Sequence, residues 1–592
     1  MSNSTSNASV FENFGLASRN TIVRLLRKRP AALPLAAIEQ FREENGIHLP
    51  TLSPRLSLVD LIECSRGLYY ESMLHTIRDR LLNRLEQVKQ KRSEDAYQTL
   101  LEPLNLYLAL NELPVIRPVV VAAIEAIPNV PQFVIDWMYK DKTLYEAVNT
   151  EVKQQLWNQY EDLFYAEAKA AMIEYAEDRL GLLRQMNNAK DDIYQLAAKV
   201  RRNRPALRNI MRLIGKHIAL YDLLLSYIRA AFVHTRSTIF CTLRADLCMA
   251  IHDMDIKELI KADPCYSFVC IMDAFIRDRQ LDSRTSMVIK KILRPYFKRG
   301  DPITGDFSMI SNDISCVRAL SQQIIRGLQQ CVAKGSLPRQ LKILHFLIRL
   351  LNLGVTGWKF DHEKRRLASA IKPQTFTDFL TSLCTCKSVA QSTALLERVE
   401  ASKRVALKQQ LVEIEAITMR RLSAELCRSK LNGIVYMFFV LDLLKTRKLA
   451  DFLKHFELLI EHRISLVDEE PYLHMFVSSL SLIPEAKWRS TGIFELLFSR
   501  YFLVSPLSHV RIHGIRLAAC IAPCLTRDQL AVLVDKLQPR ADEDELALAY
   551  DDFVAKLGSD FFEKLPESKT AEDKSALLNQ WGKLTGLLNE CE

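Results

Sequence analysis

The chain has 592 residues, of which 48% are hydrophobic and 25% are charged, close to the averages of globular proteins. Its longest uncharged run, Pro471–Pro484, has 14 residues, fewer than the roughly 20 that a membrane-spanning helix needs. The first nine residues, MSNSTSNAS, lack the apolar segment of a secretory signal. The 13 cysteines are odd in number and scattered through apolar runs, which predicts buried, reduced thiols in a cytosolic or nuclear protein.

The N-terminal third is predicted to be helical after a short flexible opening. Residues 1–34 are rich in Ser and Asn and include a short basic helix, RLLRKR, at Arg24–Arg29. An N-terminal helical region is expected over residues 35–178. Its clearest helical spacing of i, i+3, i+4 and i+7 is formed by Leu74, Ile77, Leu81, Leu82, Leu85 and Val88.

Residues 179–372 are predicted to form a basic central helical region. Between Arg179 and Arg244 there are 13 Lys and Arg residues against three acids, a net charge of +10. The segment Gly215–Asp255 predicts two helices with one apolar face each. These faces consist of Ile218, Leu224, Leu225 and Ile228 in the first helix and of Ile239, Leu243, Leu247 and Met249 in the second. The arginines Arg229, Arg236 and Arg244 are expected on cationic faces of these helices.

The C-terminal helical region is predicted over residues 373–540 and an acidic tail over residues 541–592. Leu395–Leu426 indicates a long charged helix, and the nearly all-apolar Leu431–Leu444 predicts a central buried helix. The tail holds 13 acids against five lysines, a net charge of −8. Few glycines and short Pro-containing links favour an all-α fold of HEAT-like stacked helix pairs in an extended array. A plain multi-domain helical bundle would satisfy the same pattern, since no sequence period is evident.

No motif for catalysis, a cofactor or a metal ion is found. Gly354–Gly357 is too short for a phosphate-binding loop. His509 and His513 have the i, i+4 spacing of zinc ligands without the Glu that follows the first His in metalloproteases. Cys384 and Cys386 are one residue short of a CxxC pair. We therefore predict that the protein is not an enzyme and uses no cofactor.

The basic window carries the strongest functional signal. Lys and Arg bind phosphates by releasing counterions, which requires no motif. The predicted RNA-contacting residues are Lys199, Arg201, Arg202, Arg204, Arg208, Arg212 and Lys216, and no acid lies between Lys199 and Ala219 to offset them. The aromatic residues Tyr194, Tyr221, Tyr227 and Phe232 are candidates for stacking on unpaired bases. The alternative is that these aromatics lie in the core and the basic residues form a solvated face or pair with acids.

Several collinear segments resemble the negative elongation factor B family. The longest is LYDLLLSYIRAAFVHTRSTIFCTLRADLCMAIHDMDI at 220–256, and another is LAAIEQFREENGIHLP at 35–50. Shorter ones are EVKQQLW at 151–157, IRDRQLDS at 276–283 and GDFSMI at 305–310. The resemblance runs in order from about residue 35 to 525. Leu395–Arg428 departs from the family in length and charge, and the tail is acidic where the family ends Pro-rich.

The resemblance implies a non-enzymatic, nuclear, HEAT-like scaffold. Family members join the RRM-containing negative elongation factor E and the helical negative elongation factor C/D in a complex that holds RNA polymerase II paused near promoters. A lobe of the family's scaffold is expected to contact nascent RNA, and no membrane is involved. The alternative function is a helical-solenoid adaptor of a transport or tethering complex that grips a partner peptide.

Overall fold

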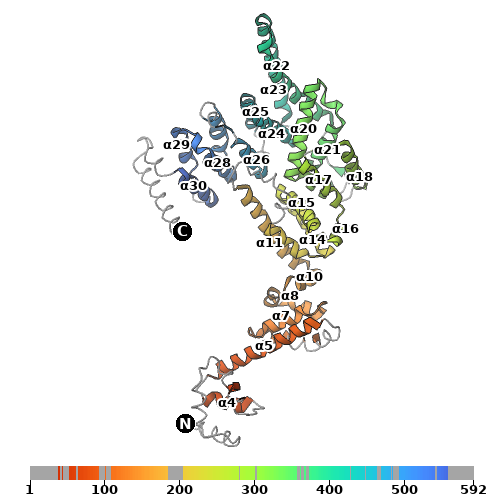
Figure 1. The fold of residues 1–592 in the computed structure, drawn as a ribbon, viewed down its shortest axis with the longest axis vertical. Helices are drawn as coiled ribbons and strands as arrows, with labels where there is room; N and C mark the ends of the chain where they lie inside the picture. Colours follow the sequence, from red (N-terminus) through yellow and green to blue (C-terminus); the bar gives the residue numbers. More distant parts are fainter. Residues whose placement is uncertain are drawn as a thin grey trace, which may run out of the picture. The chain divides into compact units, whose positions relative to one another are not determined.

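A computed structural model describes most of the chain between Ile38 and Leu557 (Figure 1). The residues that it does not describe are 1–37, 41–42, 44–51, 62–64, 92–99, 102–103, 105–107, 185–203, 279, 300–302, 357–359, 362–365, 368–372, 427, 447, 463–468, 482, 485–487, 489–491, 540–542 and 558–592. The chain divides into two compact units, residues 1–164 and 165–592. The five predicted regions remain predictions, and the opening segment 1–34 lies outside the described residues.

The smaller unit consists of short helices that follow a long one. Its elements are α4 (Leu52–Leu61), α5 (Arg66–Lys91), η1 (Leu110–Glu112), α7 (Arg117–Glu125), α8 (Gln132–Lys140), α9 (Lys142–Ala147) and α10 (Thr150–Trp157). Helix α5 confirms the helical spacing from Leu74 to Val88. Helix α9 begins where Asp141 accepts hydrogen bonds from the backbone N–H of Thr143 and Leu144, at 3.0 and 3.2 Å.

The larger unit contains the remaining described helices. They are α11 (Glu161–Arg184), which begins in the smaller unit, α13 (Pro205–Ile214), α14 (Ile218–Thr235), α15 (Thr238–Asp253), α16 (Lys257–Ala262), α17 (Tyr266–Asp278), α18 (Ser283–Arg299), α19 (Thr304–Asn312), α20 (Ile314–Lys334), η2 (Pro338–Gln340), α21 (Lys342–Thr356), α22 (Pro373–Leu395), η4 (Leu396–Arg398), α23 (Ala401–Leu426), α24 (Lys430–Lys445), α25 (Leu449–Glu461), α26 (Glu470–Leu480), the π-helix η5 (Glu495–Phe502), α28 (Ser508–Ile521), η6 (Ala522–Cys524), α29 (Arg527–Lys536) and α30 (Asp544–Leu557). The described residues add one two-stranded pair, β1 (Phe360–Asp361) antiparallel to β2 (Arg366–Leu367). The predicted all-α fold is confirmed.

Helix α24 lies at the centre of the larger unit, as its apolar sequence predicts. Ile434, Val435 and Met437 are completely buried, and α24 contacts α20, α21, α23, α25 and α26. Consecutive helices also contact one another in the pairs α14–α15, α20–α21, α22–α23 and α24–α25 (Figure 1). This pairing is compatible with stacked helix pairs, and a HEAT-like repeat geometry remains a prediction.

Gly354 permits a close approach of α19 and α21. A Cβ atom at this position would lie 2.7 Å from the carbonyl oxygen of Ser311 and 2.9 Å from the backbone nitrogen of Asn312. The hydroxyl of Ser308 donates a 2.8 Å hydrogen bond to the carbonyl of Leu353 across the same contact. Gly354 therefore serves helix packing.

Candidate nucleic-acid interface

Four of the seven predicted RNA-contacting residues lie in the described part of the chain. They are Arg204, Arg208, Arg212 and Lys216. The other three, Lys199, Arg201 and Arg202, fall within 185–203, outside the described residues, as does Tyr194.

Helix α13 presents Arg208 and Arg212 to solvent because its other face is buried. Pro205 occupies the first helical position, where its missing N–H costs no hydrogen bond. The buried face consists of Ala206, Leu207, Ile210, Met211 and Ile214. Arg208 and Arg212 are four residues apart and so share the exposed face. The exposed Lys216 follows just after the helix ends at Ile214.

Arg204 is paired with an acid from outside the range Lys199–Ala219, in which the sequence has no acid. Its guanidinium forms a two-pronged ion pair with Asp178 of α11, with Nη2 at 2.6 Å from Oδ1 and Nε at 2.5 Å from Oδ2. The side chain of Arg204 is 25% exposed. Asp178 precedes Arg204 by 26 residues, so counting charges within the window could not reveal the pair.

Helix α16 adds two basic residues that the sequence analysis missed. Lys257 and Lys261 line a shallow depression together with Glu258, Ala262 and Ile218 of α14. Ile218 is 45% exposed, so its assignment to the apolar core face was wrong. Ile218 follows Lys216 by two residues, and α14 contacts both α13 and α16. These five residues, Arg208, Arg212, Lys216, Lys257 and Lys261, are called the α13–α16 basic surface below.

Arg244 is fully buried and does not contribute to a cationic face, contrary to prediction. It donates two hydrogen bonds to Asp263, at 2.9 and 3.0 Å, and one to Asp306 at 3.3 Å. Arg229 also pairs with Asp306 at 3.3 Å, and the Tyr221 hydroxyl donates to Asp263 at 2.7 Å. Arg244, Asp263 and Asp306 thus pair their charges in the core, and the partly exposed Arg229 is a further partner of Asp306.

The pKa of Asp263 reflects this environment. Burial acts to raise the pKa of its carboxyl, but the charge and hydrogen bonds of Arg244 outweigh burial and hold it below its ordinary value. Asp263 is therefore ionised when it receives the hydrogen bonds of Arg244.

The aromatic residues of the basic window do not form a stacking platform in the part of the chain described. Tyr221 is completely buried and Phe232 is 3% exposed. Tyr227 packs edge-on against Tyr165 at 4.9 Å between ring centroids. The alternative that these side chains belong to the core therefore holds for Tyr221 and Phe232. The α13–α16 basic surface offers cations to a polyanion, without stacking from these rings.

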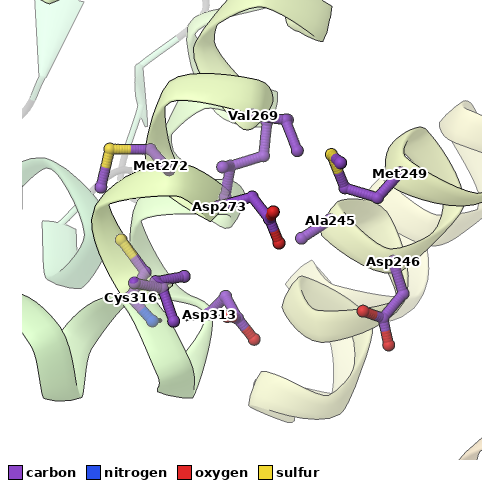
Figure 2. A pocket seen from close by; sticks show the side chains of 10 residues that line it. Ala245, Asp246, Met249, Val269, Met272, Asp273, Asp313 and Cys316 are labelled. Carbon is purple, nitrogen blue, oxygen red and sulfur yellow. Dashed lines mark hydrogen bonds between the residues drawn. The ribbon is translucent and has the colours of Figure 1, made fainter. Parts of the chain in front are cut away.

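A cavity of about 30 Å³ lies between α15, α17 and α20 (Figure 2). Figure 2 shows three of the acids that line it, Asp246, Asp273 and Asp313. Each has a partner: the Tyr175 hydroxyl donates to Asp246, Arg277 pairs with Asp273, and the Thr242 hydroxyl donates to Asp313. The volume is about that of one water molecule. The cavity therefore has no room for an organic substrate.

No group of three or more His, Cys, Asp or Glu side chains suited to a metal ion occurs within the described ranges. His513 is buried, with Nε2 at 3.5 Å from Glu470 Oε1. Burial raises the pKa of the Cys241 and Cys316 thiols, which leaves them protonated and poorly nucleophilic. No described helix is long and apolar enough to cross a membrane.

A family model described as Cofactor of BRCA1 (COBRA1) matches residues 114–461, more than half of the chain. The chain belongs to this family. Similar relatives include Negative elongation factor B of Homo sapiens, 29% identical over 520 residues, or 86% of this chain and 88% of that protein. The Mus musculus protein of the same name is 28% identical over 551 residues (92% and 93%). The Drosophila melanogaster protein is 27% identical over 515 residues (86% and 86%).

These matches confirm the resemblance to the negative elongation factor B family that the collinear segments indicated. In this member of the COBRA1 family, the matched range begins just before α7 and ends with α25. It therefore contains the α13–α16 basic surface and the buried Arg244 cluster, and excludes the acidic tail.

Proposed function

We propose that this protein is a non-enzymatic scaffold of a negative transcription elongation complex that holds RNA polymerase II in promoter-proximal pausing. The observation that carries the proposal is membership of the COBRA1 family, together with similarity over most of the chain to relatives named Negative elongation factor B. The protein works in the nucleus and needs no cofactor. Its helices serve to bind other chains, because an all-α array offers extended surfaces for partner segments.

The scaffold bridges two other proteins of the complex, the RRM-containing negative elongation factor E and the helical negative elongation factor C/D. We assign a helix of the RRM protein to the C-terminal half, about residues 373–540, and the helical partner to the N-terminal half. Amphipathic helices lie in apolar grooves of such arrays. If residues 1–370 alone captured the RRM protein at full affinity, this division would be wrong.

Affinity capture from nuclear extract tests the assembly. The tagged full-length chain should recover an RRM-bearing protein, a second helical protein and RNA polymerase II, identified by mass spectrometry. Recovery of transport or tethering components in their place would favour the adaptor alternative. Co-expression of the scaffold with its two partners followed by gel filtration should yield a single stoichiometric complex.

The proposed RNA contact involves the α13–α16 basic surface. The exposed residues Arg208 and Arg212 lie one helical turn apart on α13, Lys216 follows the end of that helix, and Lys257 and Lys261 extend the surface. Cations arranged in this way bind phosphates regardless of base sequence. Arg204, neutralised by Asp178, contributes little.

Charge reversal tests the RNA contact quantitatively. A single strand gives a salt slope of about 0.7 per neutralised phosphate, so Arg208→Glu, Arg212→Glu and Lys216→Glu together should flatten the log–log slope by up to about 2. The matched control reverses three exposed lysines outside the surface, Lys140, Lys142 and Lys169, with the same change in net charge. Fluorescence anisotropy with two unrelated RNA sequences provides the readout. An unaltered slope with failed assembly of the complex would assign these residues to an acidic protein partner.

A further inference from the structure

Helices α22 and α23 form a hairpin whose outer part is highly exposed. The two helices contact each other. Every residue of α23 from Ala401 to Gln410 is exposed, and burial is reached only farther along, at Thr418 and Leu422. Apolar residues in this exposed part therefore lack cover from the described residues.

An apolar stripe runs along α23 on a side different from its buried one. Val405 is 74% exposed and Val412 is 51% exposed. With Ala401 and Ala416 they repeat at intervals of four, seven and four residues. At 100° per residue this stripe lies roughly 110° around the helix from the side that buries Thr418 and Leu422. Apolar residues spaced by three and four form the seam along which a second helix packs.

The last 18 residues of the chain contain the complementary pattern. In residues 575–592, Leu577, Trp581, Leu584, Leu588 and Cys591 repeat at intervals of four, three, four and three. Gly582 and Gly586 in the same segment each disfavour an isolated helix by about 1 kcal/mol. A helix in this segment consequently depends on packing against another surface for its stability.

We propose that residues 575–592 dock as a helix along the Val405–Val412 stripe of α23 in the same chain. The proposal does not depend on RNA or on other proteins of the complex.

The charges of the two segments are complementary. Residues 401–421 of α23 contain five Lys and Arg against two Glu, a net charge of +3. The docking segment 575–592 contains two acids against one lysine, a net charge of −1, and the linker 558–574 contains five acids against three lysines, a net charge of −2. Opposite charges flanking an apolar seam determine which helices pair and in which orientation.

The chain is long enough to make the connection. Helix α30, the last described element, contacts α28, and contacts continue from α28 to α26, from α26 to α24 and from α24 to α23. Four interhelical steps of about 8–10 Å amount to about 40 Å. The 17 residues 558–574 span up to about 56 Å when extended. The docking segment therefore reaches α23 within one molecule.

A labelled peptide of residues 575–592 tests the proposal by fluorescence anisotropy. One receptor is the full chain with its own segment disabled by Leu584→Glu and Leu588→Glu. The peptide should bind this chain and should bind the wild-type chain at least about tenfold more weakly. The reason is that a tethered segment competes at an effective concentration of the order of millimolar. Adding Val405→Glu and Val412→Glu to the disabled chain should abolish binding.

A control pair of substitutions and a measurement of the protein's mass in solution complete the test. Val504 and Met287 are exposed by 68% and 63%, so Val504→Glu and Met287→Glu introduce the same charges at similar exposure and should leave peptide binding intact. Peptide affinity that survives Val405→Glu and Val412→Glu, or that is equal for the wild-type and disabled chains, would overturn the proposal. A wild-type protein that sediments with the mass of two chains, while the variant with Val405→Glu and Val412→Glu sediments as one chain, would also overturn it. In that case the segment docks on a second copy of the chain.

Discussion

Arg244→Met should strongly destabilise the larger unit. The substitution retains a long apolar side chain but leaves the buried carboxylate of Asp263 without its cation, and Asp306 with Arg229 alone. The side chains of Arg244, Asp263 and Asp306 are 0%, 1% and 0% exposed, so water cannot replace the lost hydrogen bonds. Removing one member of a buried ion pair costs about 3–5 kcal/mol, and that is the expected loss of unfolding free energy.

The double variant provides the more stringent comparison. Arg244→Met leaves the Asp263 carboxylate without its buried cation, Asp263→Leu leaves the Arg244 guanidinium without one of its two carboxylates, and the two substitutions together remove both charges of this pair. The double variant should therefore lose less stability than the sum of the single variants, by up to about 3 kcal/mol.

Scanning calorimetry measures the effect on the transition of the larger unit. At roughly 2 °C per kcal/mol for large domains, Arg244→Met should lower the transition temperature by about 6–10 °C. Lys257→Met is the matched control, because Lys257 is 74% exposed and makes only a long 3.9 Å ion pair. A shift for Arg244→Met no larger than that of the control, or strictly additive single and double variants, would refute the reasoning.

Two further predictions concern pH and packing. Burial, aided by the charge of Lys454, lowers the pKa of His455 to about 4, whereas an unfolded histidine titrates near 6.5. As the pH falls, His455 therefore binds a proton in the unfolded state before it does so in the folded state. The unfolding free energy should fall by up to about 3 kcal/mol between about pH 6.5 and pH 4. Urea titrations between about pH 6.5 and 4 should show this fall in unfolding free energy. In His455→Phe the part of the fall that is due to His455 should be absent. Gly354→Ala should cost about 1–3 kcal/mol because the new methyl meets backbone atoms of α19. At Gly181 an added methyl would meet nothing within 4 Å, so Gly181→Ala should instead stabilise α11 by up to about 1 kcal/mol. A melting temperature of Gly354→Ala equal to that of the wild type would contradict the packing argument.

Helix positions and the most buried helix could be predicted because they depend on local spacing. The run Leu431–Leu444 is so apolar that a helix formed from it has to be buried, and α24, which contains it, lies at the centre of the larger unit. The prediction was less accurate at the end of the hairpin: the predicted helix Leu395–Leu426 is interrupted by η4, and α23 begins at Ala401. No proline or glycine marks that break, so it leaves no local signal in the sequence.

The ion pairs could not be predicted, because they join residues far apart in the chain. Arg244 meets Asp306, 62 residues later, and Arg204 meets Asp178, 26 residues earlier. Helical periodicity indicates which side of a helix is apolar, but Arg244 lies among apolar neighbours and is buried with its counterions. Ile218 shows the converse case, an apolar residue left at the surface beside lysines of α16.

The net charge of a sequence window therefore overstates the field at the protein surface. Within the described part of the basic window, Arg204, Arg229 and Arg244 have aspartate partners, so their charges are largely cancelled at a distance. The exposed Arg208 and Arg212 of α13 belong to this window, and α16 adds lysines from outside it. A polyanion that binds here meets a short footprint across two helices. Its salt slope should accordingly follow the exposed residues of these helices and not the 13 basic residues of the window.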